Sequence, residues 1–172
     1  MNPRVAVAAL SFSAAGLIGL ALHEGFRDTA YQDSVNVTTI GFGSTEGVKR
    51  GDKITVERGL VKLAGDVSKH EAGLRKCVGD VPLYQREWDG LVSLTFNVGV
   101  GAVCGSSIPR KLRAGDYAAA CRTILDFDKV RNCSKPKVRN PRTGAMECPL
   151  VPLRGLTIRR QSEYSTCIGQ GA

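Results

Sequence analysis

The sequence lacks the usual marks of a metal-binding or nucleic-acid-binding protein. None of its six cysteines belongs to a Cys-x-x-Cys pair, and its two histidines, His23 and His70, stand alone, so we expect no metal and no cofactor. No helix-turn-helix, zinc-finger or RNA-binding aromatic motif is present, which argues against nucleic acid as a partner. Repeats and low-complexity tracts are also absent. The remaining composition is ordinary for 172 residues that fold as one domain or as two small lobes.

Charge and cysteine content say more about the partner and the compartment. A net charge of +8 favours an anionic partner, such as nucleic acid, a membrane surface or a bacterial envelope. Six cysteines in a chain with an export-like N-terminus indicate disulfides in an oxidising compartment, and the alternative is six buried thiols in a cytosolic protein. Only one pairing can be predicted locally. Cys133 and Cys148 flank a basic stretch with Pro and Gly that could hardly order itself otherwise.

One long apolar run stands near the N-terminus, from Val5 to Leu22. Its 18 residues reach the lower edge of the ~17–25 that span a bilayer as a helix. Ten of them are Ala, Gly or Ser, so the run is only weakly apolar. It suits a cleaved signal peptide, a membrane anchor or a buried helix. Because cleavage near Ala21 would leave Glu24 almost at the new terminus, we favour an export signal that later joins the fold, or a core helix throughout.

Two carboxylates and a hydroxyl follow this run at short spacing: Glu24, Asp33 and Thr39. Between Ala30 and Ser44, β-forming residues are interrupted by turn residues and closed by Gly-x-Gly. This pattern predicts a short hairpin with its turn beginning at Asp33. Glu24 would then lie at a helix end beneath the hairpin and face one cleft together with Asp33 and Thr39.

This group of residues suits cleavage of a glycosidic bond. Such cleavage needs one carboxylic acid to protonate the leaving oxygen and a second carboxylate to stabilise the oxocarbenium-like state or activate water. Glu24 emerges from an apolar helix, where desolvation favours the neutral, proton-donating form. Asp33 lies on a polar turn and should stay ionised, and Thr39 can hold the attacking water.

At these residues the chain resembles a known family. Glu24, Asp33 and Thr39, followed by Ile-Gly-Phe-Gly, are similar to the catalytic signature of the phage-type lysozymes, glycoside hydrolase family 24. The weakly apolar N-terminus resembles that of the signal-arrest-release endolysins in this family. Further similar segments cover most of the chain: Tyr84-Gln85, Trp88–Ser93, Phe96–Gly101, Arg110–Leu112, Ala114–Tyr117, Gly155-Leu156, Arg159-Arg160 and Glu163.

The resemblance implies a muramidase that causes host cell lysis. Its substrate would be the β-1,4 bond between N-acetylmuramic acid and N-acetylglucosamine in peptidoglycan. Glu24 would be the general acid, and Asp33 and Thr39 would place the water. The protein would be exported by the host bacterium, tethered to the inner membrane through Val5–Leu22 and then released to the periplasm. While it is tethered, Glu24 would lie at the membrane surface and the enzyme would be inactive.

Two departures from the family pattern affect the site. Family members often carry His directly after the Gly-x-Gly of the hairpin, where this chain has Ser44. A contact made by that His must therefore be absent or replaced. The segment from Asn132 to Pro149 looks like an insertion near the cleft and would alter access of the substrate.

The rest of the chain has a helical pattern. Thr55 is expected to cap a helix that runs to about Cys77. Further helices are expected at about Leu83–Val98, Asp116–Asp126 and Leu153–Ile168. The predicted fold class is α+β and lysozyme-like, with a mainly helical larger lobe, a small β-hairpin lobe and the active-site cleft between them. Residues 1–24 would form the N-terminal helix with the catalytic Glu and residues 25–172 the catalytic domain, with the hairpin lobe at about 28–50 and the helical lobe at about 55–172.

Other conspicuous residues receive plainer interpretations. Trp88 is expected in the core, His70 partly buried, and Glu46, Glu71 and Asp126 at the surface.

Two further residues are candidates for binding substrate, Asn97 and Arg159. Asn97 would shape the floor of the cleft. We expect that Arg159 and Arg160 do not both face the core, and that one lines the cleft or pairs with Glu163 one turn later.

We expect a monomer that acts on peptidoglycan. Three alternatives to the muramidase function remain open. A lytic transglycosylase needs the acid but no partner that places water. A non-catalytic, cationic envelope-binding or membrane-disrupting protein would suit the charge and the apolar N-terminus equally well. A cytosolic nucleic-acid binder is opposed by the export-like segment and the cysteines.

Overall fold

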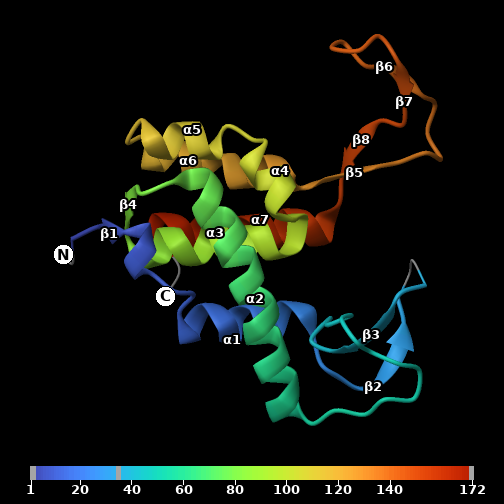
Figure 1. Cartoon of the computed structure of the whole chain (residues 1–172). Helices are drawn as coiled ribbons and strands as arrows, with labels where there is room; N and C mark the ends of the chain where they lie inside the picture. Colours follow the sequence, from blue (N-terminus) through green and yellow to red (C-terminus); the bar gives the residue numbers. More distant parts are fainter. Residues whose placement is uncertain (1–2, 34–35, 171–172) are drawn as a thin grey trace.

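A computed structural model describes residues 3–33 and 36–170 of the chain. Figure 1 shows a larger lobe of helices and, beside it, a small lobe built on one β-hairpin. The helix α2 (Val56–Val78) runs from the small lobe into the larger one (Figure 1). This arrangement confirms the predicted α+β class.

The apolar N-terminal run is not one continuous helix. It forms a two-residue strand β1 (Val5–Ala6), a 3₁₀ turn η1 (Val7–Ala9) and only then α1 (Ala14–Glu24). Strand β1 pairs antiparallel with β4 (Pro82–Leu83). The helix begins where the Ser13 hydroxyl accepts a hydrogen bond from the Gly16 amide. In the part of the chain that the structure describes, no helix combines the length and apolar content needed to cross a bilayer.

Polar side chains of the helical lobe hold the segment that precedes α1. Arg75 donates to the carbonyl oxygens of Val7 and Leu10. Glu71 accepts hydrogen bonds from the Phe12 amide at 2.7 Å and from the Trp88 indole at 2.8 Å. Glu71 is buried, so its expected place at the surface is wrong, and these hydrogen bonds are the reason.

The hairpin lobe follows directly from the end of α1. Gly25 ends the helix with a positive φ of 69° and donates its amide hydrogen to the Ala21 carbonyl. Strands β2 (Arg27–Gln32) and β3 (Thr38–Gly41) then pair antiparallel. The predicted hairpin is present, although it begins three residues before Ala30. Residues 34 and 35 of its predicted turn lie outside the described residues.

Seven elements complete the helical lobe. They are α2, α3 (Gln85–Val98), α4 (Val100–Cys104), α5 (Ile108–Arg113), α6 (Tyr117–Thr123), the 3₁₀ turn η2 (Ile124–Phe127) and α7 (Arg154–Ile168). Thr55 caps α2 as predicted, by accepting from the Arg58 amide. Trp88 is fully buried, as expected for a core residue. A Cβ added at Gly90 would lie 2.9 Å from the Glu163 carbonyl oxygen, so glycine permits the close packing of α3 on α7.

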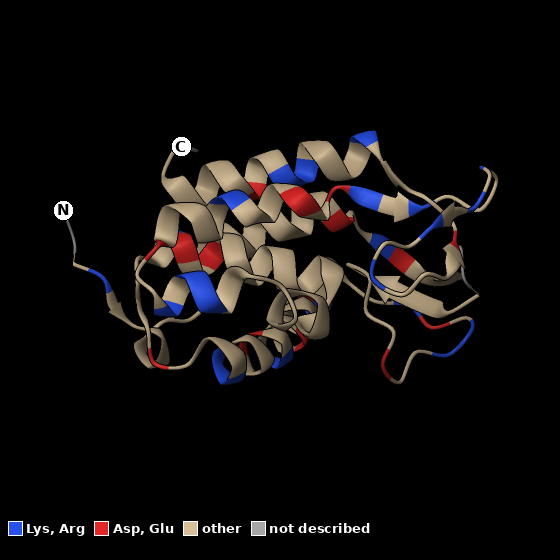
Figure 2. Cartoon of the chain, turned by 90° about the horizontal axis from the view of Figure 1, so that it is seen from above, with Lys and Arg blue, Asp and Glu red and all other residues tan. Residues whose placement is uncertain are grey.

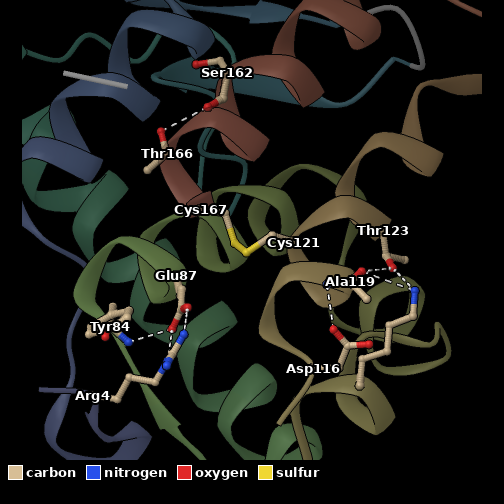
Figure 3. The surroundings of a disulfide bond; sticks show 11 residues. Arg4, Tyr84, Glu87, Asp116, Ala119, Cys121, Thr123, Ser162, Thr166 and Cys167 are labelled. Atoms are coloured by element: carbon tan, nitrogen blue, oxygen red, sulfur yellow. Dashed lines mark hydrogen bonds and ion pairs between the residues drawn. A yellow bond between two sulfur atoms is a disulfide. The ribbon is translucent and has the colours of Figure 1, made fainter. Parts of the chain in front are cut away.

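Disulfides link helices that are distant in the sequence. Cys77–Cys104 joins α2 to α4, and Cys121–Cys167 joins α6 to α7 (Figure 3). The third disulfide, Cys133–Cys148, is the predicted one.

Between η2 and α7 the chain forms an extension, which we call the arm (residues 129–152). Strands β5 (Lys129–Arg131) and β8 (Leu150–Pro152) pair at its base. Strands β6 (Val138–Arg139) and β7 (Met146–Glu147) pair near its tip. Figure 1 shows the arm projecting from the same end of the helical lobe as the hairpin lobe.

Candidate active site

Glu24 is the last residue of α1 and faces both lobes. Its side chain is 21% exposed, and its Oε1 accepts a hydrogen bond from Arg159 Nη1 at 2.8 Å. Its Oε2 points toward the hairpin, where a Cβ built on Gly43 would lie 3.7 Å away. Gly43 has a φ of +92°, which glycine adopts without strain. The Gly-x-Gly that closes the hairpin therefore brings backbone close to the carboxylate.

A hollow of about 730 Å³ opens beside Glu24. It is lined by Glu24, Gly25, Phe26, Arg27, Asp28, Thr29, Ala30, Tyr31 and Gly41. Glu24 is thus placed where a ligand can reach it, against one face of the hairpin. Of the three residues predicted to be catalytic, Glu24 lines this hollow, and Asp33 and Thr39 do not.

Asp33 and Thr39 lie farther along the same hairpin. Thr39 pairs with Tyr31, which lines the hollow, but its side chain is buried and its hydroxyl donates to the Val37 carbonyl at 3.1 Å. The Asp33 carboxylate accepts from the Val37 amide at 2.8 Å. Both side chains are therefore bonded to the same residue of the turn.

Behind Glu24 lies a buried cluster of charges, of which the sequence predicted only the pairing of an arginine with Glu163. Arg159 and Arg160 are 9% and 0% exposed, so the expectation that they cannot both face the core is wrong. The carboxylate of Glu163 allows both to be buried. Arg159 Nε lies 3.2 Å from Glu163 Oε1 and Arg160 Nε lies 2.8 Å from Glu163 Oε2. Ser93 donates to Glu163 Oε1 at 3.0 Å.

Burial shifts the proton affinities in this cluster. It raises the pKa of Glu163, against the opposing effect of the two guanidinium groups. Burial also lowers the pKa of Arg160. The pKa of His23, which precedes Glu24, is lowered first by burial and then by the positive charge of Arg159. His23 is therefore expected to be neutral near pH 7.

The predicted substrate-binding residues differ in their surroundings. Arg159 bridges Glu24 and Glu163, and within the described part of the chain its buried Nη2 has no hydrogen-bond partner. Asn97 is exposed, and its Oδ1 accepts from Arg160 Nη2 at 3.0 Å. The cluster thus connects both residues to Glu24.

Ser44 replaces the histidine that the family pattern often has after the hairpin. It is buried, and its hydroxyl donates to Asp66 Oδ2 on α2 at 2.7 Å. Its backbone bonds in both directions with Ile40. A hydrogen bond to a carboxylate therefore ties the hairpin lobe to α2 at this position.

A helix that ends in a partly exposed acid beneath a β-hairpin, beside a larger helical lobe, defines a glycoside hydrolase of the lysozyme type. The phage lysozyme family model matches residues 21–163. The chain therefore belongs to the phage lysozyme family, and it is a muramidase.

Individual relatives agree with this assignment. The chain is 35% identical over 154 residues to an endolysin of Acyrthosiphon pisum secondary endosymbiont phage 1, covering 90% of this chain and 95% of the relative. It is 31% identical to a SAR-endolysin of Pseudomonas phage phiKMV, covering 98% and 93%. Among solved structures, an endolysin from Escherichia coli O157:H7 phage FAHEc1 superposes with a TM-score of 0.77 at 30% identity, covering 93% and 94%.

Proposed function

We propose that the chain is an endolysin that hydrolyses the β-1,4 bond between N-acetylmuramic acid and N-acetylglucosamine, and so lyses the host cell. One observation carries the proposal: Glu24 lines the hollow against the hairpin while Arg159 holds one of its oxygens at 2.8 Å. An acid in this place can reach a glycosidic oxygen and is kept in one orientation by a buried partner. Orientation of this kind is a large part of what an active site contributes to catalysis.

In the proposed reaction Glu24 protonates the leaving oxygen, and Arg159 stabilises the carboxylate that this transfer produces. Asp33 and Thr39 place the attacking water. Arg159 and Asn97 are the proposed substrate-binding residues: Arg159 contacts Glu24, and Asn97 is exposed and borders the same cluster.

The chemistry is tested by Glu24→Gln, which keeps the size of the side chain and removes the acid. We expect kcat on purified sacculi to fall by roughly 100- to 10 000-fold, with an unchanged melting temperature. Near-normal turnover would refute the role of Glu24. If the unchanged protein showed no cleavage at all, a non-catalytic envelope-binding protein would be favoured instead.

The role of Asp33 and Thr39 requires a separate measurement. Hydrolysis yields muropeptides with reducing ends, whereas a lytic transglycosylase yields 1,6-anhydro ends. Mass analysis of the products therefore distinguishes the two. Asp33→Asn and Thr39→Ala should each slow the release of reducing ends, while a transglycosylase would tolerate both changes.

We also propose that membrane release of residues 1–24 controls the catalytic domain, residues 25–172. Val5–Leu22 would tether the exported protein to the inner membrane, and release to the periplasm would let α1 dock and bring Glu24 under the hairpin. The similarity to a SAR-endolysin and the apolar run support this proposal. Ile18 and Leu22 of α1 remain 62% and 80% exposed in the docked form, so the helix keeps an apolar face.

The best variant for this test is Gly19→Leu. A Cβ at Gly19 has no atom within 4 Å among the described residues, whereas one at Gly16 would lie 2.7 Å from the Phe12 ring and disturb the docked form. Gly19→Leu makes the run more apolar and should keep the protein in the membrane fraction and delay lysis. Gly19→Ser is the matched control. Equal release of the two variants from the membrane fraction would refute the membrane proposal.

A further inference from the structure

The arm carries most of the net charge of the molecule. Residues 129–152 contain six Lys and Arg residues and one acidic residue, Glu147, a net charge of +5 out of the chain's +8. At the base, Lys129 pairs with Asp128 and Arg131 pairs with Glu147. The cations farther along the arm are all exposed: Lys135, Lys137, Arg139 and Arg142. Figure 2 shows basic segments recurring at the end of the molecule opposite the N-terminus.

These charges stand on an ordered support. The Cys133–Cys148 disulfide closes the arm between its two short sheets. At the tip the Asn140 side chain accepts from the amides of Arg142 and Thr143 and so shapes the turn. Cations held in this way lose less conformational entropy on binding than cations on a free tail.

The arm also begins close to the acid. Helix α7 starts two residues after β8 ends, and Arg159, which binds Glu24, is five residues into that helix. At ~1.5 Å per residue the base of the arm lies roughly 8 Å along α7 from Arg159. A ligand bound across Glu24 can therefore extend to the arm, which projects from the same end of the helical lobe as the hairpin lobe (Figure 1).

The composition of the arm limits what it can bind. It contains no Phe, Tyr or Trp, the side chains that stack on nucleic-acid bases or on the apolar face of a sugar ring. Exposed Lys and Arg instead suit carboxylates and phosphates. Stem peptides of peptidoglycan carry carboxylates, and they protrude from the glycan on which the acid would act.

We propose that the arm is a binding surface for the anionic stem peptides of peptidoglycan, beside the cleft that holds the glycan. This inference rests on the proposed function, because it assumes peptidoglycan in the cleft. The arm then supplies affinity for the polymer without touching the bond that is broken.

The test compares two triple variants with the same charge change. Lys135→Gln/Lys137→Gln/Arg142→Gln alters the arm, and Lys76→Gln/Arg110→Gln/Arg122→Gln alters exposed cations of the helical lobe. Each removes three positive charges. Both are made in the Glu24→Gln background, so that binding is measured without digestion, and thermal melting confirms that both fold.

Dissociation constants are measured on intact sacculi and on sacculi whose stem carboxyl groups have been amidated. On intact sacculi the arm variant should bind about tenfold more weakly than the parent, as expected for the loss of three exposed charge contacts. The helical-lobe variant should change less than twofold. On amidated sacculi the arm variant and the parent should bind alike.

Several results would overturn the proposal. Equal loss in both triple variants would show that only net charge matters. A loss that persists on amidated sacculi would mean that the arm binds something other than the carboxylates. Weakened binding to vesicles of anionic phospholipid, with sacculi unaffected, would make the arm a membrane contact. Failure of the unchanged protein, with Glu24 intact, to cleave sacculi would refute the proposed function, while the binding comparison would still decide the role of the arm.

Discussion

The docking of α1 offers the sharpest test of how this fold positions its acid. Ser13 does two things at once: its hydroxyl accepts from the Gly16 amide as the helix cap, and it donates to Asp89 Oδ2 at 2.7 Å. Asp89 is buried and also accepts from the Ser13 amide at 3.0 Å. Losing the cap costs about 1 kcal/mol, and losing the hydrogen bond to a charged acceptor costs about 1.5–3 kcal/mol. We therefore expect Ser13→Ala to lower the free energy of unfolding by about 3 kcal/mol.

A double-mutant cycle isolates the Ser13–Asp89 contact. Ser13→Ala, Asp89→Asn and the double variant are compared by urea denaturation, with Asp116→Ala as the control. Asp116 caps α6 by accepting from the Ala119 amide, away from α1, and its loss should cost about 1 kcal/mol. The coupling between Ser13 and Asp89 should be about 1.5 kcal/mol. Coupling below about 0.3 kcal/mol would show that the contact does not hold the helix.

Activity provides the second readout of this prediction. Because α1 ends at Glu24, a loosened N-terminus of the helix should disturb the acid at its other end. Ser13→Ala should therefore slow the clearing of sacculi several-fold at a temperature where the protein stays folded. Asp116→Ala should leave that rate unchanged. A rate that is equally unaffected in both variants would refute the link between docking and the acid.

Three further predictions concern other parts of the molecule. Replacing Cys133 and Cys148 by Ser should open the arm to trypsin between these positions, with little change in the melting temperature, because the arm's strands pair with each other; cuts mapped elsewhere would contradict this. Ser44→Ala should cost about 1–2 kcal/mol in urea denaturation, because it removes the 2.7 Å hydrogen bond from buried Ser44 to half-buried Asp66; a neutral effect would argue against the link. The folded-state pKa of His23 lies below its ordinary value of 6.5, so its contribution to stability is present above pH 6.5 and is lost as pH falls through the folded pKa. His23→Gln should accordingly melt at a less pH-dependent temperature between pH 7.5 and pH 5, and an unchanged pH dependence would contradict the shift.

The sequence predicted the elements whose signals are local. Thr55 before an apolar stripe indicated the start of α2, and the β-formers closed by Gly41 and Gly43 indicated the hairpin. Cys133–Cys148 was predictable because the two residues close a short loop. The other two disulfides join α2 to α4 and α6 to α7, and the choice among pairings depends on packing that no local pattern reveals.

The candidate site was predictable only in part. Glu24 followed from its spacing to the hairpin, but its partner Arg159 is 135 residues away. Two adjacent arginines on one helix are normally too costly to bury, which led to the wrong expectation for Arg159 and Arg160. What makes their burial possible is Glu163 together with its donor Ser93, a combination that exists only after α3 packs on α7.

Under the proposed membrane release, the N-terminal segment has to suit both a membrane and a folded core. Much of its hydrogen bonding to the helical lobe uses its backbone: Arg75 binds the carbonyls of Val7 and Leu10, and Glu71 binds the Phe12 amide. Its side chains can therefore remain apolar without losing these contacts. The contacts that dock the segment are made by buried polar residues of α2 and α3. Glu71 is one of them, although from the sequence alone it was interpreted as an ordinary surface charge. A substitution such as Glu71→Gln should consequently weaken docking of α1 while leaving the apolar run itself, and its affinity for a bilayer, unchanged.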